Sequence, residues 1–293
     1  MIDGTITAMI TPMLNDGSVD YKAFEEQLDF QAKNGVGGVV VLGTTGESPT
    51  LNETEQKELA ELAIGRFGKA GGKVIIGTGT SSTETTLKKT IMARDMGADA
   101  ALVVTPPYNK PNKSGLIEHF RRAADIMPII IYDIKGRTGR QIEIDEFIEI
   151  AKHPNVIGVK AASGDIKQIE ELINKVAKPI QKSGREFRVW SGDDGITVRV
   201  RKLGGDGVIS VASNLTPALV NTIAAGDLAA AEIAAADSEP LMKTAFIECN
   251  PVPIKHMMYT VGLIKSNAVR LPLGQLQPEN KTAVEEVARR YCQ

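Results

Sequence analysis

One lysine near the middle of the chain is placed where it could act as a nucleophile. The stretch VIGVKAASG, from Val156 to Gly164, runs through apolar and small residues into Lys160 and breaks at Ser163-Gly164. This pattern predicts a buried strand with Lys160 at its end. Burial disfavours the ammonium form of a lysine, and the neutral amine can attack a carbonyl carbon to form a Schiff base. The alternative is a structural lysine whose amine reaches solvent or pairs with a carboxylate.

Hydroxyl and guanidinium side chains end or follow other apolar runs of the chain. A Schiff-base lysine needs a hydroxyl that moves protons as carbinolamine becomes imine and imine becomes enamine, and tyrosine can do this. An arginine can bind a substrate carboxylate through two hydrogen bonds. The candidates of these types are Thr44, Thr45, Tyr108, Tyr132 and Arg137. Each alone is more often a turn or packing residue, but together they indicate a lysine-dependent aldolase acting on an oxo acid.

Eight short apolar runs that alternate with helical patterns must position these residues. The predicted strands are residues 5–12, 36–42, 73–79, 98–105, 128–132, 156–160, 187–190 and 206–211. This alternation favours parallel strands closed into an α/β fold of the (β/α)8 TIM-barrel type. An open dinucleotide-binding sheet is disfavoured, because the glycines around Gly77 and Gly79 lack the third glycine of its motif. In a barrel the carboxyl ends of all strands share one end, so the candidate residues are expected to converge there.

No further buried strand is predicted after about Thr216. Three segments there, residues 228–237, 254–263 and 282–290, have helical composition. We therefore expect a catalytic barrel over residues 1–224 and a helical C-terminal extension over residues 225–293. Local capping residues also predict that one helix begins after Asn52 and another at Ser114.

Composition excludes several classes of protein. The 293 residues are 42% hydrophobic, enough to bury a large core, and their formal net charge of -2 argues against a nucleic-acid or membrane-surface partner. There is no signal-peptide pattern, and two cysteines, Cys249 and Cys292, are too few for a disulfide framework, so a cytoplasmic protein is expected. His119, His153 and His256 stand singly, without metal-ligand spacing, so no metal is expected.

Three segments resemble the signatures of the dihydrodipicolinate synthase and N-acetylneuraminate lyase superfamily, in matching order over nearly the whole chain. They are GTTGES from Gly43 to Ser48, Tyr-x-x-x-x-Arg-Thr-Gly from Tyr132 to Gly139, and Val159-Lys160 followed by Ala162 to Asp165. Within the superfamily, three features resemble the dihydrodipicolinate synthases. They are Arg137-Thr138-Gly139, Pro-x-Tyr-Asn-Lys-Pro around Tyr108, and NPVPIK from Asn250 to Lys255.

The resemblance implies a Schiff-base aldolase that condenses pyruvate with L-aspartate-4-semialdehyde to 4-hydroxy-tetrahydrodipicolinate, in lysine and diaminopimelate biosynthesis. It implies no cofactor. Lys160 would form the Schiff base with pyruvate. Thr44, Tyr132 and Tyr108 would form the proton relay, with Tyr108 supplied across a dimer interface. Family members are commonly tetramers built from two tight dimers, so a homo-oligomer, either tetramer or dimer, is expected.

The same resemblance implies three substrate-binding residues. Thr45, with its neighbouring backbone, would hold the pyruvate carboxylate. Arg137 would receive the carboxylate of aspartate semialdehyde. Ile209, near the end of the last predicted strand, would line the pyruvate pocket.

Some positions depart from the family pattern. Asp133, Lys135 and Ala161 stand where asparagine, proline and glutamate are usual, which adds a carboxylate and an ammonium beside Arg137. The positions that match the feedback site of lysine-inhibited members read Glu53, Gln56, Ser81, Thr85 and Pro107. These residues predict weak or absent inhibition by lysine.

Two alternatives stay open from the sequence. One is another pyruvate-dependent lyase of the superfamily, acting on sialic acid or a sugar-derived 2-oxo acid, which Arg137 disfavours. The other belongs to a different class: a barrel that keeps the pocket but works as a non-catalytic binding or regulatory protein, with Lys160 merely structural.

Overall fold

The computed structural model describes residues 2 and 4–292, and within them eight strands form a closed barrel. The strands follow one another in sequence order, and those with a defined register pair in parallel. This confirms the predicted (β/α)8 architecture. The strands are β1 (Gly4–Ala8), β2 (Gly38–Val41), β3 (Lys73–Gly77), β4 (Ala100–Val104), β5 (Ile129–Asp133), β6 (Val156–Ala161), β7 (Arg188–Ser191) and β8 (Gly207–Ser210).

Helices follow each strand and continue beyond the last one. Those between strands are α1 (Tyr21–Lys33), α2 (Glu53–Ala63), α3 (Thr83–Met96), α4 (Lys113–Ala124), α5 (Lys135–Thr138), α6 (Ile144–Ile150), α7 (Ile166–Leu172), α8 (Lys178–Lys182) and α9 (Thr197–Leu203). Those after β8 are α10 (Pro217–Ala225), α11 (Leu228–Asp237), α12 (Glu239–Thr244), α13 (Val252–Thr260) and α14 (Pro278–Tyr291). Across residues 2 and 4–292, none of these helices has both the length and the apolar character needed to span a membrane.

The chain divides into two compact units. One comprises Met1–Val74 with Ser210–Gln293, and the other comprises Ile75–Ile209. The C-terminal helices thus belong to the same unit as β1, β2 and their helices. The predicted boundary between residues 224 and 225 falls at the end of α10, and it stays a prediction.

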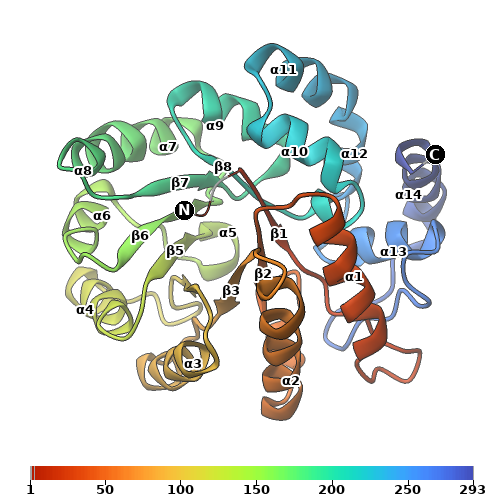
Figure 1. Cartoon of the computed structure of the whole chain (residues 1–293), viewed down its shortest axis with the longest axis horizontal. Helices are drawn as coiled ribbons and strands as arrows, with labels where there is room; N and C mark the ends of the chain where they lie inside the picture. The colour runs from red at the N-terminus through yellow and green to blue at the C-terminus, as the bar shows by residue number, and fades with distance from the viewer. Residues whose placement is uncertain (1, 3, 293) are drawn as a thin grey trace. The chain divides into compact units, whose positions relative to one another are not determined.

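The first unit holds an apolar cluster formed largely by its C-terminal helices. Helices α13 and α14 lie side by side, in blue in Figure 1. Their buried side chains include Ile254, Met257, Met258 and Val284, which pack with Leu241 of α12. Burial of this apolar surface stabilises the extension and fixes α13 in place.

The second unit contains the run of strands from β4 to β7. Figure 1 shows β5, β6 and β7 side by side. Strand β4 pairs in parallel with β5, β5 with β6, and β6 with β7. All five residues of β5 are buried. This matches the continuous apolar runs expected of parallel strands that are covered on both faces.

Two helix starts show how local capping works. Asn52 caps α2, accepting a hydrogen bond from the Glu55 backbone N–H, and the Glu55 side chain accepts one from the Asn52 N–H. This capping box confirms the predicted start. The prediction that Ser114 begins a helix was wrong, because Asn112 caps α4 by accepting from the Gly115 N–H at 3.0 Å. Asparagine is as good a cap as serine, so the earlier of the two residues starts the helix.

Candidate active site

Lys160 is the penultimate residue of β6, near the end of a strand as the sequence predicted. The residue is 5% exposed, so almost all of its side chain is buried. Its Nζ lies over the face of the Tyr132 ring, 4.4 Å from the centroid. No carboxylate within residues 2 and 4–292 forms an ion pair with this amine. The side chain is thus neither largely exposed nor, among the described residues, in a buried ion pair, and these are the two arrangements expected of a structural lysine.

Strand register places the residues around Lys160. Lys160 pairs with Tyr132 on β5 and with Trp190 on β7, and Trp190 pairs in turn with Gly207 on β8. Register partners in parallel strands point to the same face of the sheet. Ile209, two residues after Gly207 and 1% exposed, faces the same way. Lys160, Tyr132 and Ile209 are thus three predicted site residues that share one face of the second unit's strands.

Asp133 follows Tyr132 and points to the opposite face. Its carboxylate is 2% exposed and accepts hydrogen bonds from Gln168 of α7 at 3.3 Å and from the Ile142 backbone N–H at 3.4 Å. The contact with α7 shows that this is the helix-covered face, so Lys160 and Tyr132 point into the barrel. Burial raises the pKa of Asp133 to about 6, and the two hydrogen bonds oppose that rise.

Arg137 is carried by the short helix α5, which follows β5. Its side chain is exposed. The turn around it is held by the buried Thr138, whose Oγ1 donates to the Ile134 carbonyl at 3.1 Å and the Arg140 carbonyl at 2.9 Å. Arg140 in turn forms an ion pair with Glu146 of α6. Arg137 is therefore presented on a turn that its neighbours hold in place.

Tyr108 lies in the loop after β4 and is 91% exposed. Its φ of 71° places it in the left-handed region, where residues other than glycine are uncommon. The next residue, Asn109, holds the loop by donating from Nδ2 to the Ser81 carbonyl at 2.5 Å. With so little of its side chain covered, Tyr108 is not packed against the buried Lys160 within a single chain.

Thr44 and Thr45 lie in the first unit, in the loop Gly43–Ser48 that follows β2. Thr45 is 2% exposed, and its Oγ1 accepts a hydrogen bond from Asn250 Nδ2 at 3.0 Å. Thr44 is half-buried, and its carbonyl accepts from the Glu47 backbone N–H at 3.0 Å. Leu42 and Glu47, on either side of the threonines, both have positive φ, at 61° and 54°. Such residues cost about 1 kcal/mol or more each and persist only where surrounding contacts hold them.

A buried ion pair holds one end of this loop. Lys255 Nζ of α13 donates to Glu47 Oε1 at 2.8 Å, and both side chains are 0% exposed. The other oxygen, Glu47 Oε2, accepts from the Arg270 backbone N–H at 3.0 Å. Desolvation lowers the pKa of Lys255, and the charge of Glu47 opposes that shift. An ion pair without solvent contact is retained only where such additional hydrogen bonds satisfy it.

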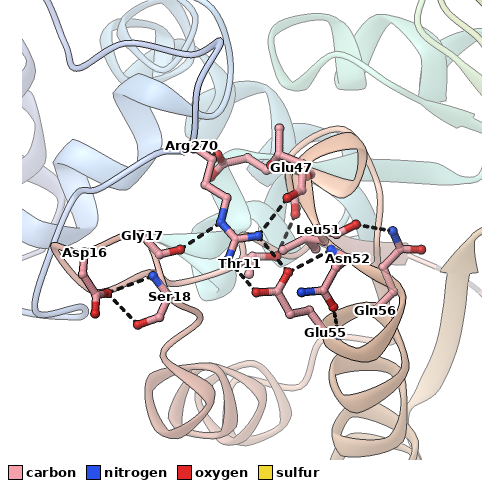
Figure 2. Close-up of polar contacts among 12 residues, drawn as sticks. Thr11, Asp16, Gly17, Ser18, Glu47, Leu51, Asn52, Glu55, Gln56 and Arg270 are labelled. Carbon is pink, nitrogen blue, oxygen red and sulfur yellow. Dashed lines mark hydrogen bonds and ion pairs between the residues drawn. The ribbon is translucent and has the colours of Figure 1, made fainter.

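Arg270 extends the contacts around the loop, as Figure 2 shows. Its guanidinium forms two hydrogen bonds with the Glu55 carboxylate, at 2.7 and 2.5 Å, and donates to the carbonyls of Gly17 and Thr50, each at 2.8 Å. Hydrogen bonding from Arg270 holds the pKa of the Glu55 carboxyl below its usual value. One arginine thus links the start of α2, the loop after β2 and the segment after α13.

The sequence did not predict this set of contacts. Glu47 and Lys255 both lay in quoted motifs, but nothing in either motif paired them. A charged residue inside the apolar run of α13 was the one available signal, because a buried lysine needs a partner. Arg270 carried no signal. No group of three or more histidine, cysteine, aspartate or glutamate side chains suited to a metal occurs in the described part of the chain.

Comparison with known proteins identifies the family. A model of the dihydrodipicolinate synthetase family matches residues 1–290. The chain belongs to this family. The predicted resemblance is thereby confirmed, and the matched residues include parts of both units.

Individual family members agree closely. A 4-hydroxy-tetrahydrodipicolinate synthase of Methanoculleus marisnigri is 41% identical over 293 residues, covering 96% of each chain. The solved dihydrodipicolinate synthase of Thermotoga maritima has a TM-score of 0.94 at 37% identity and covers 99% of each chain. The chloride-inhibited enzyme of Acinetobacter baumannii, solved with pyruvate, has a TM-score of 0.92 at 35% identity, covering 99% of this chain and 98% of that one.

Proposed function

We propose that this protein is a Schiff-base aldolase that condenses pyruvate with L-aspartate-4-semialdehyde to 4-hydroxy-tetrahydrodipicolinate, a step of lysine and diaminopimelate biosynthesis. The observation that carries the proposal is Lys160, buried at the end of a barrel strand without an ion-pair partner among the described residues. Its amine lies over the ring of a tyrosine at the same level of the neighbouring strand. Family membership and the pyruvate complex of the Acinetobacter relative support the choice of substrate.

The chemistry begins with attack of the Lys160 amine on the ketone carbon of pyruvate. Loss of water gives an imine, and loss of a methyl proton gives an enamine. The enamine carbon then attacks the aldehyde of the second substrate, which forms the new carbon–carbon bond and leaves a hydroxyl group. The amino group of that substrate displaces Lys160 from the imine carbon, so the ring closes and the enzyme's amine is restored. One water is released for each pair of substrates joined.

Protons must move at several of these steps, and we assign them to hydroxyl groups. Tyr132 is the first candidate, because its ring already contacts the Lys160 amine. Thr44 and Tyr108 complete the proposed relay, on the strength of the family motifs in which they lie. Tyr108 is assigned as a residue supplied to a second copy of the chain, an assignment supported by its 91% exposure and constrained backbone.

The remaining roles concern binding of carboxylates. Thr45 and the adjacent backbone hold the carboxylate of pyruvate, and Ile209 lines the pocket beside it. Arg137 receives the carboxylate of aspartate semialdehyde. The proposed assembly is a homo-oligomer, either a dimer or a tetramer of two tight dimers.

Reduction with borohydride in the presence of pyruvate tests the proposal. Borohydride converts the imine to a stable amine, so peptide mass spectrometry is expected to find a pyruvyl adduct on Lys160. Lys160→Arg keeps the positive charge but should form no adduct, and Lys167→Arg, a matched change outside the site, should leave the adduct unchanged. If the unmodified chain forms no adduct on Lys160, the aldolase assignment is wrong.

A further inference from the structure

The ion pair between Glu47 and Lys255 reaches a loop that the proposed reaction uses. Glu47 belongs to the same six-residue loop, Gly43–Ser48, as Thr44 and Thr45. The two charges are 2.8 Å apart, and neither side chain has solvent contact. Replacing a buried ion pair with apolar residues of the same volume often leaves stability unchanged or raises it. Stability alone therefore does not explain why this pair is present. What it provides is a defined geometry.

That geometry acts on a strained part of the backbone. Glu47 has a φ of 54°, and Leu42, the residue just before the loop, has a φ of 61°. The Glu47 N–H donates to the Thr44 carbonyl at 3.0 Å, so the backbone of Glu47 is linked directly to that of the threonine. A left-handed glutamate would relax to an ordinary conformation if its side chain were not fixed.

Both carboxylate oxygens of Glu47 are fixed by parts of the chain remote in sequence. Oε1 is bound by Lys255 of α13, and Oε2 by the Arg270 backbone N–H at 3.0 Å. Arg270 is itself held by Glu55 at the start of α2, as drawn in Figure 2. Thr45 receives a second contact from the same region, because Asn250 donates to its Oγ1 at 3.0 Å.

We propose that Glu47 and Lys255 are positioning residues of the reaction: their buried ion pair holds the loop Gly43–Ser48 so that Thr44 and Thr45 meet pyruvate in a productive geometry. This inference rests on the proposed function. Neither residue touches substrate, and each acts through the threonines. The C-terminal helix α13 thereby has a positioning role, because it supplies the cation that fixes the loop.

A double variant separates this role from simple stability. Lys255→Ala would leave a buried carboxylate unpaired and would unfold the protein too easily to be informative. Glu47→Gln combined with Lys255→Met removes both charges at nearly the same volume, and a chain of this kind is expected to fold. Glu47→Gln alone, the second variant, keeps one acceptor for the Arg270 N–H but leaves the buried ammonium of Lys255 without a carboxylate, so it is expected to be less stable than the double variant. The matched control is Glu239→Gln with Lys243→Met, which removes the exposed pair of α12, 2.7 Å apart.

Steady-state kinetics give the first readout. We expect the double variant to lower kcat about 100-fold, because displacement of a catalytic group by about 1 Å has an effect of this size. KM for pyruvate should rise about tenfold, while KM for aspartate semialdehyde should stay within about twofold, since Arg137 lies outside the loop. The folded fraction of the single variant should show the same pattern. A general loss of folded enzyme would lower kcat without this difference between the two KM values.

Hydrogen exchange gives a second readout that does not depend on activity. The amides of Glu47 and Ser48 are bonded within the loop, and they should exchange faster in both Glu47 variants but not in the control. If the double variant has wild-type kinetics, or reduced activity with unchanged exchange over residues 43–48, the inference is wrong. An absence of the pyruvate adduct in the unmodified chain would instead overturn the proposed reaction. If the adduct is absent and exchange over residues 43–48 is also unchanged in the Glu47 variants, the proposal that the ion pair holds the loop is wrong as well.

Discussion

Lys160 and Tyr132 are register partners on neighbouring parallel strands, and the lysine amine lies 4.4 Å from the centroid of the tyrosine ring. The ring face attracts a cation and also shields the amine from water. We therefore propose two separable functions for the tyrosine at this position. Its ring packs against the lysine, and its hydroxyl is the group assigned to the proposed proton relay.

Replacing Tyr132 with phenylalanine separates these functions. The ring is kept and the hydroxyl is lost, so we expect turnover to fall about 100-fold or more, the usual effect of losing a general acid or base. The melting temperature should hardly change. Tyr259→Phe, on the partly exposed face of α13, is the matched control and should have normal turnover. Near-normal turnover in Tyr132→Phe would exclude Tyr132 from the proton transfers.

Replacing Arg137 with alanine tests the binding of the second substrate. A charge-assisted hydrogen bond contributes about 1.5 to 3 kcal/mol, so KM for aspartate semialdehyde should rise about 10- to 150-fold. KM for pyruvate and borohydride trapping on Lys160 should change little. Arg122→Ala, which removes an exposed arginine of α4, is the control. Equal increases in both KM values would indicate that Arg137 organises the whole turn instead.

Asp133 should make the stability of the protein depend on pH. Burial raises the pKa of its carboxyl from 3.8 to about 6, so the folded state holds this proton more tightly than the unfolded state does. The free energy of unfolding contributed by this group is therefore highest below pH 3.8. It falls as pH rises to 6, by at most about 3 kcal/mol, and stays low above pH 6.

Asp133→Asn removes this titration. At pH 8 the variant should be more stable than the wild type, because it has no buried carboxylate. The gain should be less than about 3 kcal/mol, because the asparagine amide nitrogen is a donor and would face the donor Gln168 Nε2. At pH 4 the advantage should disappear. Urea unfolding at both pH values measures the difference, with the exposed Asp237→Asn as control. A stability difference that is the same at pH 4 and pH 8 would contradict the assigned burial effect.

Lysine should inhibit this enzyme weakly or not at all. A site for free lysine must offer partners to a carboxylate and an ammonium at once. Gln56, at one of the matching positions, already donates from Nε2 to the Leu51 carbonyl at 2.7 Å (Figure 2). Glu84, one position before the matching Thr85, lies at the surface and pairs with Lys88 at 2.8 Å. Both side chains thus already have partners within the chain.

Initial rates against lysine decide this point. We expect no more than slight inhibition at 1 mM lysine, measured with both substrates near their KM values. Half-maximal inhibition below about 1 mM, equivalent to ~4 kcal/mol of binding, would show that a competent site exists despite these substitutions.

Local sequence determined much of the fold and part of the candidate site. Apolar runs broken by polar or glycine residues predicted all eight strands, because strands covered on both faces are apolar over most of their length. The same pattern placed Lys160 at the end of β6, and the order of the strands then made Tyr132 its neighbour. Capping chemistry is also local, which is why the start of α2 at Asn52 was correct. Where two good caps lay close together, at Asn112 and Ser114, local rules did not choose between them.

Tertiary structure alone decided which charges meet. Glu47 and Lys255 are 208 residues apart, and Arg270 lies 215 residues from Glu55. No periodicity connects such positions, because the pairing depends on how α13 packs over its apolar cluster and where the following segment returns to the loop. The pKa of Asp133 depends in the same way on burial beneath α7. The sequence determines which residues can do chemistry. Desolvation and the partners that distant segments contribute determine the geometry and the charge state of those residues.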